Sequence, residues 1–301
     1  MCTIGNSFWN AEGLLFNTVF KQCDLVDKTA FLNPVKQTSK SGIDYVAFTR
    51  QKGDITPAWA GVNQYGVCFV AADSYLKKNE KGLWKKKENG PTVFDMYLKI
   101  ITDFKTAREA TEMAKEFYKN VGYSDDMTDI LMIADSHEIF FIETLNKDVR
   151  IVKRTNGHFV STNHCRMFYG TAPYDQNHST FLRLNRAEAL LNKRDDNTGI
   201  GDLLRDSYYG KTVWSICRYA SVTDADLETA KSTDEDMFYT QACVMFTIKP
   251  NGDNLPVVAC EFVTNGNAKD KEGFIWYPFE KGEPSKELYI GYNENLWHKV
   301  P

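Results

Sequence analysis

The run ILMIADSHEIFFIETLNKDVRIVKRTNGHFVSTNH, residues 130–164, decides the fold class of this chain. It contains short segments rich in β-branched and aromatic residues, with turn residues such as Asn156-Gly157 between them. Such a pattern is typical of consecutive antiparallel strands. The run therefore predicts an antiparallel meander that ends at Thr162-Asn163-His164. Its four predicted strands are 130–134, 139–143, 149–153 and 158–162.

The segment before this run predicts two strand hairpins and a helical region. One hairpin turns at Ala11-Glu12-Gly13, and the other lies within 59–72 and turns at Asn63-Gln64-Tyr65-Gly66. Residues 92–118 are predicted to be helical, with Thr106 and Glu109 in a capping-box pattern.

The segment after it predicts more helices and then strands again. We expect an amphipathic helix at 179–192, a short helix around Leu203-Leu204, a hairpin of 242–248 with 257–263 across a loop at 249–255, and a strand at 274–277. This order has no regular alternation of strand and helix. It therefore favours an α+β sandwich of antiparallel sheets covered by helices over a parallel doubly wound fold.

Length and charge restrict the class of protein. The 301 residues contain 36 Lys and Arg against 40 Asp and Glu, a formal charge of −4, which gives no reason to expect nucleic acid. No linker composition appears, so we expect one domain over 1–301. Because no stretch approaches the roughly 18 apolar residues of a membrane span, and no leader is evident, we expect a cytoplasmic protein that binds no membrane.

The cysteines and histidines give no metal or cofactor motif. The seven cysteines are scattered without CxxC spacing, which favours reduced thiols. His164 next to Cys165 is the best Cys/His pair, but neighbouring strand residues point to opposite faces. The sequence also has no phosphate-binding glycine loop, so we expect no cofactor and no metal.

Residues 76–90 are rich in lysine and follow a predicted buried strand. A solvated loop is the usual explanation for such a run. A flexible lid is the alternative.

Cys2 directly follows the initiator methionine and precedes Thr3-Ile4-Gly5-Asn6. Removal of Met1, which we expect, would make one residue supply both a thiol nucleophile and, in its α-amino group, a base. The reference pKa of that amino group, about 7.7 to 8.0, suits proton transfer at neutral pH. The alternative is that Cys2 is an ordinary small apolar residue.

Polar residues at predicted strand ends are candidates to serve this nucleophile. They are Lys21, Asp24, Asp73 and Asn163, with Arg183 one turn into a helix. A carboxylate would orient the terminal amine, a side-chain amide would donate to an oxyanion, and a cation would favour the thiolate. Each residue has a simpler alternative role as a surface charge or turn former.

In chain order, these segments resemble the cysteine branch of the N-terminal-nucleophile hydrolases. The resemblance is to proteins similar to isopenicillin N acyltransferase, with choloylglycine hydrolases and penicillin V acylases as relatives, and it spans residues 2–263. The matching segments are Met1-Cys2-Thr3, Phe20-Lys21-Gln22-Cys23-Asp24, Gly61-Val62-Asn63-Gln64-Tyr65-Gly66-Val67, Ile133-Ala134-Asp135 with Glu143, Thr162-Asn163-His164, residues 179–190, and Leu204-Arg205-Asp206 with Ser215-Ile216-Cys217-Arg218.

The resemblance implies a four-layered αββα sandwich and an acyl-enzyme on Cys2. It also implies that Asp24 lies near the amine of the nucleophile, and that Asn163 forms an oxyanion hole with position 73. Candidates for contact with the substrate are Trp59, Tyr75 and Arg218.

Several residues depart from the pattern of bile-salt hydrolases and penicillin acylases. Lys21 stands in place of a frequent arginine, Asp73 in place of an asparagine, and Thr180 where another arginine would align, with Arg183 the nearest basic residue. These differences argue against bile-salt specificity. Because an ionised Asp73 would repel an oxyanion, we expect the backbone N–H of residue 73 to be the donor. Arg218 either binds a carboxylate of the substrate or forms a surface salt bridge.

The preferred hypothesis is a cofactor-free amidase that cleaves a small linear N-acyl or non-peptide amide, with water resolving a thioester on Cys2. An N-acyltransferase would use the same acyl-enzyme with an amine or an acyl-coenzyme A, which the lysine-rich segment would attract. A dipeptidase and a degenerate binding protein are further alternatives. The expected partner is a small-molecule amide, and a homo-oligomer is left open.

Overall fold

The structure, a computed structural model, describes residues 2–11, 13–25, 29–74, 91–120, 128–145, 147–169, 178–193, 200–210, 214–218, 239–264, 273–279 and 289–290. Met1, Tyr75 and the lysine-rich segment 76–90 lie outside these residues.

The first of two sheets contains the start of the chain. Among the described residues its strands are, in spatial order, β10 (His158–Ser161), β1 (Cys2–Ala11), β2 (Leu14–Leu25), β11 (Tyr239–Asn251), β12 (Asn254–Thr264), β13 (Gly273–Trp276) and β14 (Tyr289–Ile290). Every neighbouring pair is antiparallel. β1 therefore has a partner strand on each side, and the predicted hairpins β1–β2 and β11–β12 are confirmed.

The second sheet follows the order of the chain. Its described strands are β3 (Val35–Thr38), β4 (Asp44–Thr49), β5 (Ala58–Asn63), β6 (Cys68–Ser74), β7 (Thr128–Ala134), β8 (Ile139–Leu145) and β9 (Asp148–Arg154). The predicted hairpin turn after β5 is confirmed, because Asn63 Oδ1 accepts hydrogen bonds from the backbone N–H groups of Tyr65 and Val67. Gly66 completes this turn at a φ of 76°, a conformation that glycine adopts without strain.

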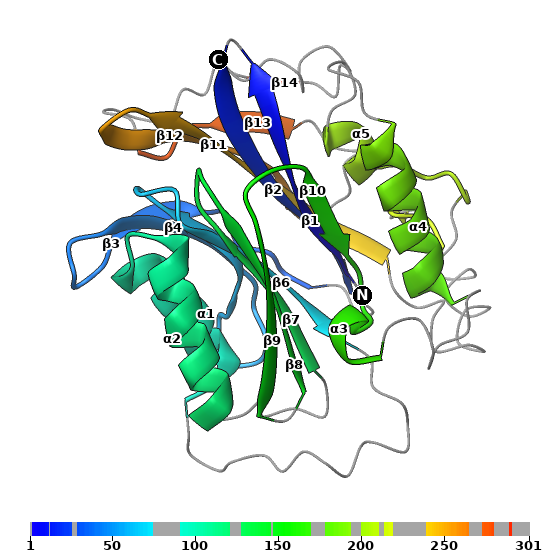
Figure 1. The fold of residues 1–301 in the computed structure, drawn as a ribbon, viewed down its shortest axis with the longest axis horizontal. Helices are drawn as coiled ribbons and strands as arrows, with labels where there is room; N and C mark the ends of the chain where they lie inside the picture. The colour runs from blue at the N-terminus through cyan, green and yellow to red at the C-terminus, as the bar shows by residue number, and fades with distance from the viewer. Residues whose placement is uncertain are drawn as a thin grey trace.

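Helices cover the outer face of each sheet (Figure 1). α1 (Val93–Asp103) and α2 (Ala107–Asn120) pack on the second sheet, whereas α4 (Ser179–Asn192) and α5 (Ile200–Arg205) pack on the first. α3 (Arg166–Tyr169) is a short helix after β10. The layers run helix, sheet, sheet, helix, so the predicted αββα sandwich is confirmed.

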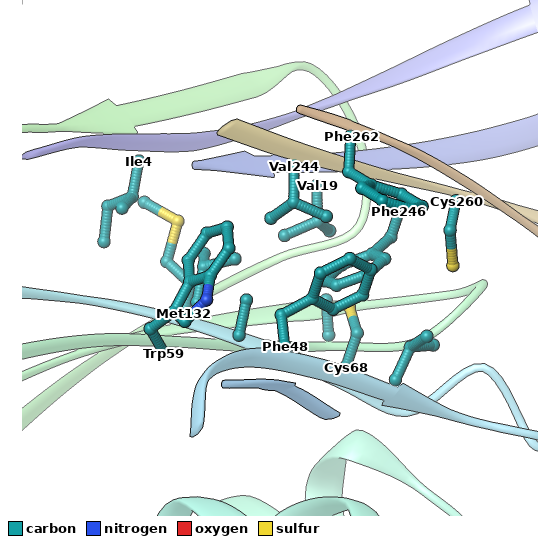
Figure 2. Packing of buried hydrophobic residues seen from close by; sticks show 14 of the residues in the cluster. Ile4, Val19, Phe48, Trp59, Cys68, Met132, Val244, Phe246, Cys260 and Phe262 are labelled. Carbon is teal, nitrogen blue, oxygen red and sulfur yellow. The ribbon is translucent and has the colours of Figure 1, made fainter. Parts of the chain in front are cut away.

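The central core lies between the two sheets. Figure 2 shows Val244 and Phe246 of the first sheet above Phe48 and Trp59 of the second. The ring centroid of Phe48 lies 5.5 Å from that of Phe246 and 5.2 Å from that of Phe262, both on the first sheet. Buried aromatic contacts of this kind fix the separation of the sheets, and so the width of any site between them.

The predicted meander is right for three strands and wrong for the fourth. β7, β8 and β9 pair in succession, but β10 leaves that sheet and pairs with β1, where Ile4 lies opposite Ser161. The hydrophobic pattern of a strand does not identify its partner, because both sheets face the same core. This change of sheet brings the residues after β10 to the start of β1.

Three other sequence predictions differ from the structure in detail. The helical region 92–118 is two helices, because Phe104 is extended and Thr106 caps α2 by accepting a hydrogen bond from the N–H of Glu109. The loop between β11 and β12 is shorter than predicted, since Asn251 pairs with Asn254. β3 and β4 were not predicted, and every residue of β3 is exposed, so it lacks an apolar signal.

We expect Gly5→Ala to lower the free energy of unfolding by about 2–3 kcal/mol. An added Cβ would lie 2.7 Å from the Phe159 carbonyl oxygen and 2.4 Å from the Phe20 ring, and the strand pairing fixes the carbonyl in place. Urea denaturation measures the effect. Gly13→Ala is the matched control, because nothing lies within 4 Å of its Cβ and only its φ of +77° opposes alanine. It should cost about 1 kcal/mol, and equal losses would contradict the steric explanation.

Candidate active site

Cys2 is the first residue of β1 and lies directly opposite Cys23 of β2. Directly opposed residues of an antiparallel pair project to the same face of a sheet. Both belong to the central core with Ile4, two positions along β1, and Cys2 is only 7% exposed. The Cys2 thiol is therefore held between the two sheets, beside a second thiol.

Lys21 lies two residues before Cys23 and faces the same interior layer. Its Nζ donates a hydrogen bond of 3.1 Å to the carbonyl oxygen of Trp59 in the opposite sheet, and lies 5.5 Å from the centroid of the Trp59 ring. The structure thus brings Lys21 and Trp59, two of the residues predicted from the sequence, into contact. A buried ammonium group at this place favours negative charge on nearby atoms.

The Cys2 thiol has an unusually low pKa. A hydrogen bond with the Cys23 side chain is the main cause that lowers the pKa of Cys2 to about 5, burial opposes it, and the charge of Lys21 lowers the pKa further. The same hydrogen bond, together with burial, raises the pKa of Cys23. At neutral pH, Cys2 is therefore the thiolate and Cys23 the donor.

Asn163 follows β10 and makes four hydrogen bonds. Its Oδ1 accepts from the backbone nitrogen of Cys2 at 2.8 Å and from Arg183 Nη2 at 2.8 Å. Its Nδ2 donates to the carbonyl oxygen of Asp73 at 2.7 Å, and its backbone N–H donates to Thr180 Oγ1 at 2.9 Å. Two donors contact Oδ1, and a carbonyl oxygen contacts Nδ2. This set of partners fixes the orientation of the side-chain amide.

Arg183 of α4 is fully buried against the start of β1. Its Nη1 donates to the carbonyl oxygen of Cys2 at 2.6 Å and to Thr3 Oγ1 at 3.0 Å. These contacts hold the outer helix against the carbonyl oxygen of Cys2. Through Asn163 Oδ1, Arg183 is also linked to the backbone nitrogen of Cys2. Arg183 thus holds the backbone of Cys2 rather than its thiol.

Thr180 is a site residue that sequence reasoning missed, since it was noted only as a departure from relatives. In addition to the Asn163 N–H, its Oγ1 lies 2.8 Å from Thr162 Oγ1 and 3.0 Å from His164 Nδ1. Burial is the first cause that lowers the pKa of His164, to about 3, so this ring is neutral. The only sequence signal for Thr180 was its place in the first turn of α4.

Asp24 and Arg218 form a buried pair. Arg218 Nε lies 3.5 Å from Asp24 Oδ2, and Asp24 Oδ1 accepts a hydrogen bond of 2.7 Å from Thr240 Oγ1. Arg218 is 2% exposed, so of its two predicted roles the surface salt bridge is wrong. Asp24 is near enough to Cys2 for its charge to raise the pKa of that thiol.

Asp73 contributes its main chain to the site, and its side chain lies elsewhere. Strand alternation puts its carboxylate on the face of β6 that is covered by α1 and α2, directly opposite Asp129 of β7. Asp73 is exposed, whereas Asp129 is buried and accepts hydrogen bonds from Tyr97 and Tyr118. The expected donation from the backbone N–H of residue 73 stays a prediction, and its carbonyl oxygen is the atom that contacts Asn163.

We expect Asp129→Asn to remove part of the pH dependence of stability. Burial is the main cause that raises the pKa of Asp129 to about 7. Between pH of about 4 and 7, the folded chain keeps a proton that the unfolded chain has lost, so the free energy of unfolding falls as pH rises, by up to about 1.4 kcal/mol per pH unit. Asparagine cannot ionise and lacks this slope. Urea denaturation across this range measures it.

The control for this measurement is Asp148→Asn, because the Asp148 side chain is 61% exposed. This variant should keep the wild-type slope. An Asp129→Asn variant with the same slope as wild type would show that Asp129 is ionised in the folded chain at low pH.

In the part of the chain that the structure describes, no three His, Cys, Asp or Glu side chains gather as metal ligands. No helix there is long and apolar enough to cross a membrane.

Comparisons with solved structures find matches at low sequence identity. A mutant of conjugated bile acid hydrolase from Clostridium perfringens superposes with a TM-score of 0.51 at 12% identity, covering 96% of this chain and 99% of that one. A second variant of that hydrolase gives 0.45 at 12% identity, with coverage of 96% and 99%. An N-acylethanolamine-hydrolyzing acid amidase ortholog from Caenorhabditis elegans gives 0.40 at 13% identity, covering 96% and 97%. The first similarity supports the fold alone.

A search of curated proteins finds no match to the chain. The family model described as acyl-coenzyme A:6-aminopenicillanic acid acyl-transferase matches residues 28–225, about two thirds of the chain. The match begins after the β1–β2 hairpin, so Cys2, Lys21 and Asp24 lie outside it. It agrees with the resemblance that the sequence motifs predict. On this match the chain belongs to the acyl-coenzyme A:6-aminopenicillanic acid acyl-transferase family.

Proposed function

We propose that this protein is an N-terminal-nucleophile amidase that cleaves a small linear N-acyl or other non-peptide amide through a thioester on Cys2. The observation that carries the proposal is the place of the Cys2 backbone nitrogen, 2.8 Å from Asn163 Oδ1, with the thiol facing Lys21 and Cys23. After removal of Met1, the same nitrogen would be an amine held by a fixed acceptor.

Each group of the site has a separate role in the proposed reaction. The Cys2 sulfur attacks the amide carbonyl carbon, and the α-amine of the same residue carries a proton to the leaving amine. The acyl group then remains on sulfur as a thioester, and water releases it as the acid. Asp24, with its carboxylate held by Thr240 and Arg218, supplies negative charge that favours the ammonium form of the amine.

Asn163 is suited to stabilise the oxyanion. Its Oδ1 accepts from Cys2 and Arg183, so only Nδ2 is able to donate. One hydrogen of Nδ2 is used by the Asp73 carbonyl oxygen, which leaves a second hydrogen for a substrate oxygen. A preorganised donor of this kind is typically worth about 10²–10³ in kcat.

Trp59 is the best-supported of the three substrate-binding candidates. Its Nε1 is buried, and among the described residues it has no hydrogen-bond partner. An unpaired indole N–H in the layer that contains Lys21 and Cys2 would be satisfied by a polar atom of a bound ligand. Arg218 is instead paired with Asp24, and Tyr75 lies outside the described residues.

Intact mass and acyl trapping test the proposal together. Protein from the native producer should lack Met1, and acid quenching during turnover of acyl p-nitroanilides of varied chain length should show one acyl group on the Cys2 peptide. Retention of Met1 would remove the free α-amine that carries the proton to the leaving amine, and would overturn the mechanism. A chain that lacks Met1 but forms no adduct with any amide would favour the binding-protein alternative.

Acyl transfer is the second candidate function, and the family description favours it. An amine would then take the place of water in resolving the thioester. Hydroxylamine, added at increasing concentration during turnover, distinguishes the two outcomes. Hydroxamate in place of free acid at low hydroxylamine would indicate a transferase, and free acid throughout would indicate a hydrolase.

A further inference from the structure

The opposition of Cys2 and Cys23 places two thiols in the geometry of a cross-strand pair. Directly opposed residues of antiparallel strands have Cα atoms about 4.5–5.5 Å apart, which falls within the range of about 4.4–6.8 Å found for disulfides. Both side chains face the interior layer, and both cysteines are free thiols here. A bond between them would therefore join neighbouring strands without separating the sheets.

The two thiols also differ in protonation state, as the formation of a disulfide by oxidation requires. Cys2 is the thiolate, which is the form that attacks hydroperoxides, and Cys23 is held protonated beside it. Three other core cysteines differ from Cys2 in this respect. Burial raises the pKa of Cys68, Cys243 and Cys260, so these thiols stay protonated and react slowly.

We propose that Cys2 and Cys23 form a reversible oxidation site for hydroperoxides, at which the nucleophile candidate is locked as a disulfide. The Cys2 thiolate attacks one peroxide oxygen, the O–O bond breaks, and with one proton the products are Cys2 sulfenic acid and water. The Cys23 sulfur then attacks the sulfenic sulfur and loses its proton, and the hydroxyl group leaves as a second water. The peroxide is reduced, and the two thiols are oxidised to one disulfide.

Two consequences follow from this arrangement. The disulfide protects Cys2 from sulfinic and sulfonic acids, which are not reversed by thiols. It also removes the sulfur nucleophile until a dithiol reductant restores it by exchange. Neither step uses the α-amine of Cys2, so the oxidation site does not depend on the proposed amidase function.

Peptide mapping of the full-length protein tests the site. Reduced protein is treated with hydrogen peroxide, its remaining thiols are blocked with N-ethylmaleimide, and the digest is analysed by mass spectrometry with and without prior dithiothreitol. We expect a Cys2–Cys23 cross-linked peptide that dithiothreitol removes, and oxidation of Cys2 at least about tenfold faster than that of Cys260.

Variants separate the role of Cys23 from general oxidation. In Cys23→Ser, whose hydroxyl keeps a hydrogen-bond donor beside the Cys2 sulfur, Cys2 should gain two or three oxygen atoms that dithiothreitol does not remove. Cys23→Ala also removes that donor, so the same irreversible oxidation should be slower there. Cys260→Ala is the matched control, since Cys260 is equally buried in the same core, and it should still form the Cys2–Cys23 bond. Sulfinic acid on wild-type Cys2 with Cys23 still alkylable, or a bond from Cys2 to another cysteine, would overturn the proposal. The cross-linked peptide and the oxygen atoms gained by Cys2 are both read as peptide masses. The test therefore gives the same answer whether or not the protein is an active amidase.

Discussion

We expect Cys2→Ala to abolish turnover of any amide substrate, with a loss of about 10⁵-fold or more in kcat/KM. The sulfur is the atom to which the acyl group is transferred, and the neighbouring Cys23 thiol does not replace it, because burial still raises the pKa of Cys23 when the hydrogen bond to Cys2 is gone. Stability should change little, since the substitution removes one atom from a residue at the first position of a strand. Hydrolysis of acyl p-nitroanilides and thermal unfolding measure the two effects.

The control for this loss is Cys260→Ala, a core cysteine of β12 with no contact to the site. It should keep wild-type activity. Cys2→Ser adds a second comparison, because it keeps a nucleophilic atom but lacks the low pKa of the thiol. Full activity in Cys2→Ala would rule out the acyl-enzyme, and full activity in Cys2→Ser would rule out a need for the thiolate.

The second large effect is expected at Arg183. Arg183→Met keeps an unbranched apolar stem but removes the guanidinium donor for Cys2 O, Thr3 Oγ1 and Asn163 Oδ1. Asn163 Oδ1 keeps the Cys2 N–H, whereas the other two acceptors lose a charged donor, and at about 1–3 kcal/mol for each loss we expect the free energy of unfolding to fall by about 3–5 kcal/mol. Because Asn163 and the Cys2 main chain would both lose their anchor, kcat should also fall by about 10²-fold or more.

Arg186→Met is the matched control, from the same helix. Arg186 pairs with Asp206 at 2.6 Å, and its side chain is 25% exposed and that of Asp206 9% exposed. Its loss should cost about 1–2 kcal/mol, because water reaches this pair only in part, and leave kcat unchanged. If Arg183→Met were as stable as Arg186→Met, the hydrogen bonds to Cys2 and Asn163 would not be holding the site.

The sequence was sufficient to predict those elements whose hydrophobic pattern and turn residues lie within one short segment. The bounds of α4 agree with the predicted helix 179–192, because helical periodicity is contained in one segment. The β1–β2 hairpin could be predicted from a turn residue and two apolar runs. The sandwich followed from the order of such segments.

The site was less predictable because its contacts are long-range. Cys2 and Asn163 are 161 residues apart, and Asp24 and Thr240 are 216 apart. The sequence marks these residues as polar positions at strand ends, but strand partners are decided by packing, as the move of β10 to the first sheet shows. For the same reason the burial of Arg218 and the central place of Thr180 were missed.

The pairing of β1 with β10 sets a time limit during synthesis. A ribosome that adds about 5–20 residues per second needs about 10–30 s to pass from Cys2 to Asn163. Until then β1 is paired with β2 alone, and Cys2 lacks its hydrogen bond to Asn163. Once β1 is enclosed between β10 and β2, its first residue is buried. The proposed mechanism therefore requires that Met1 be removed before β10 pairs with β1 and Asn163 binds the backbone nitrogen of Cys2.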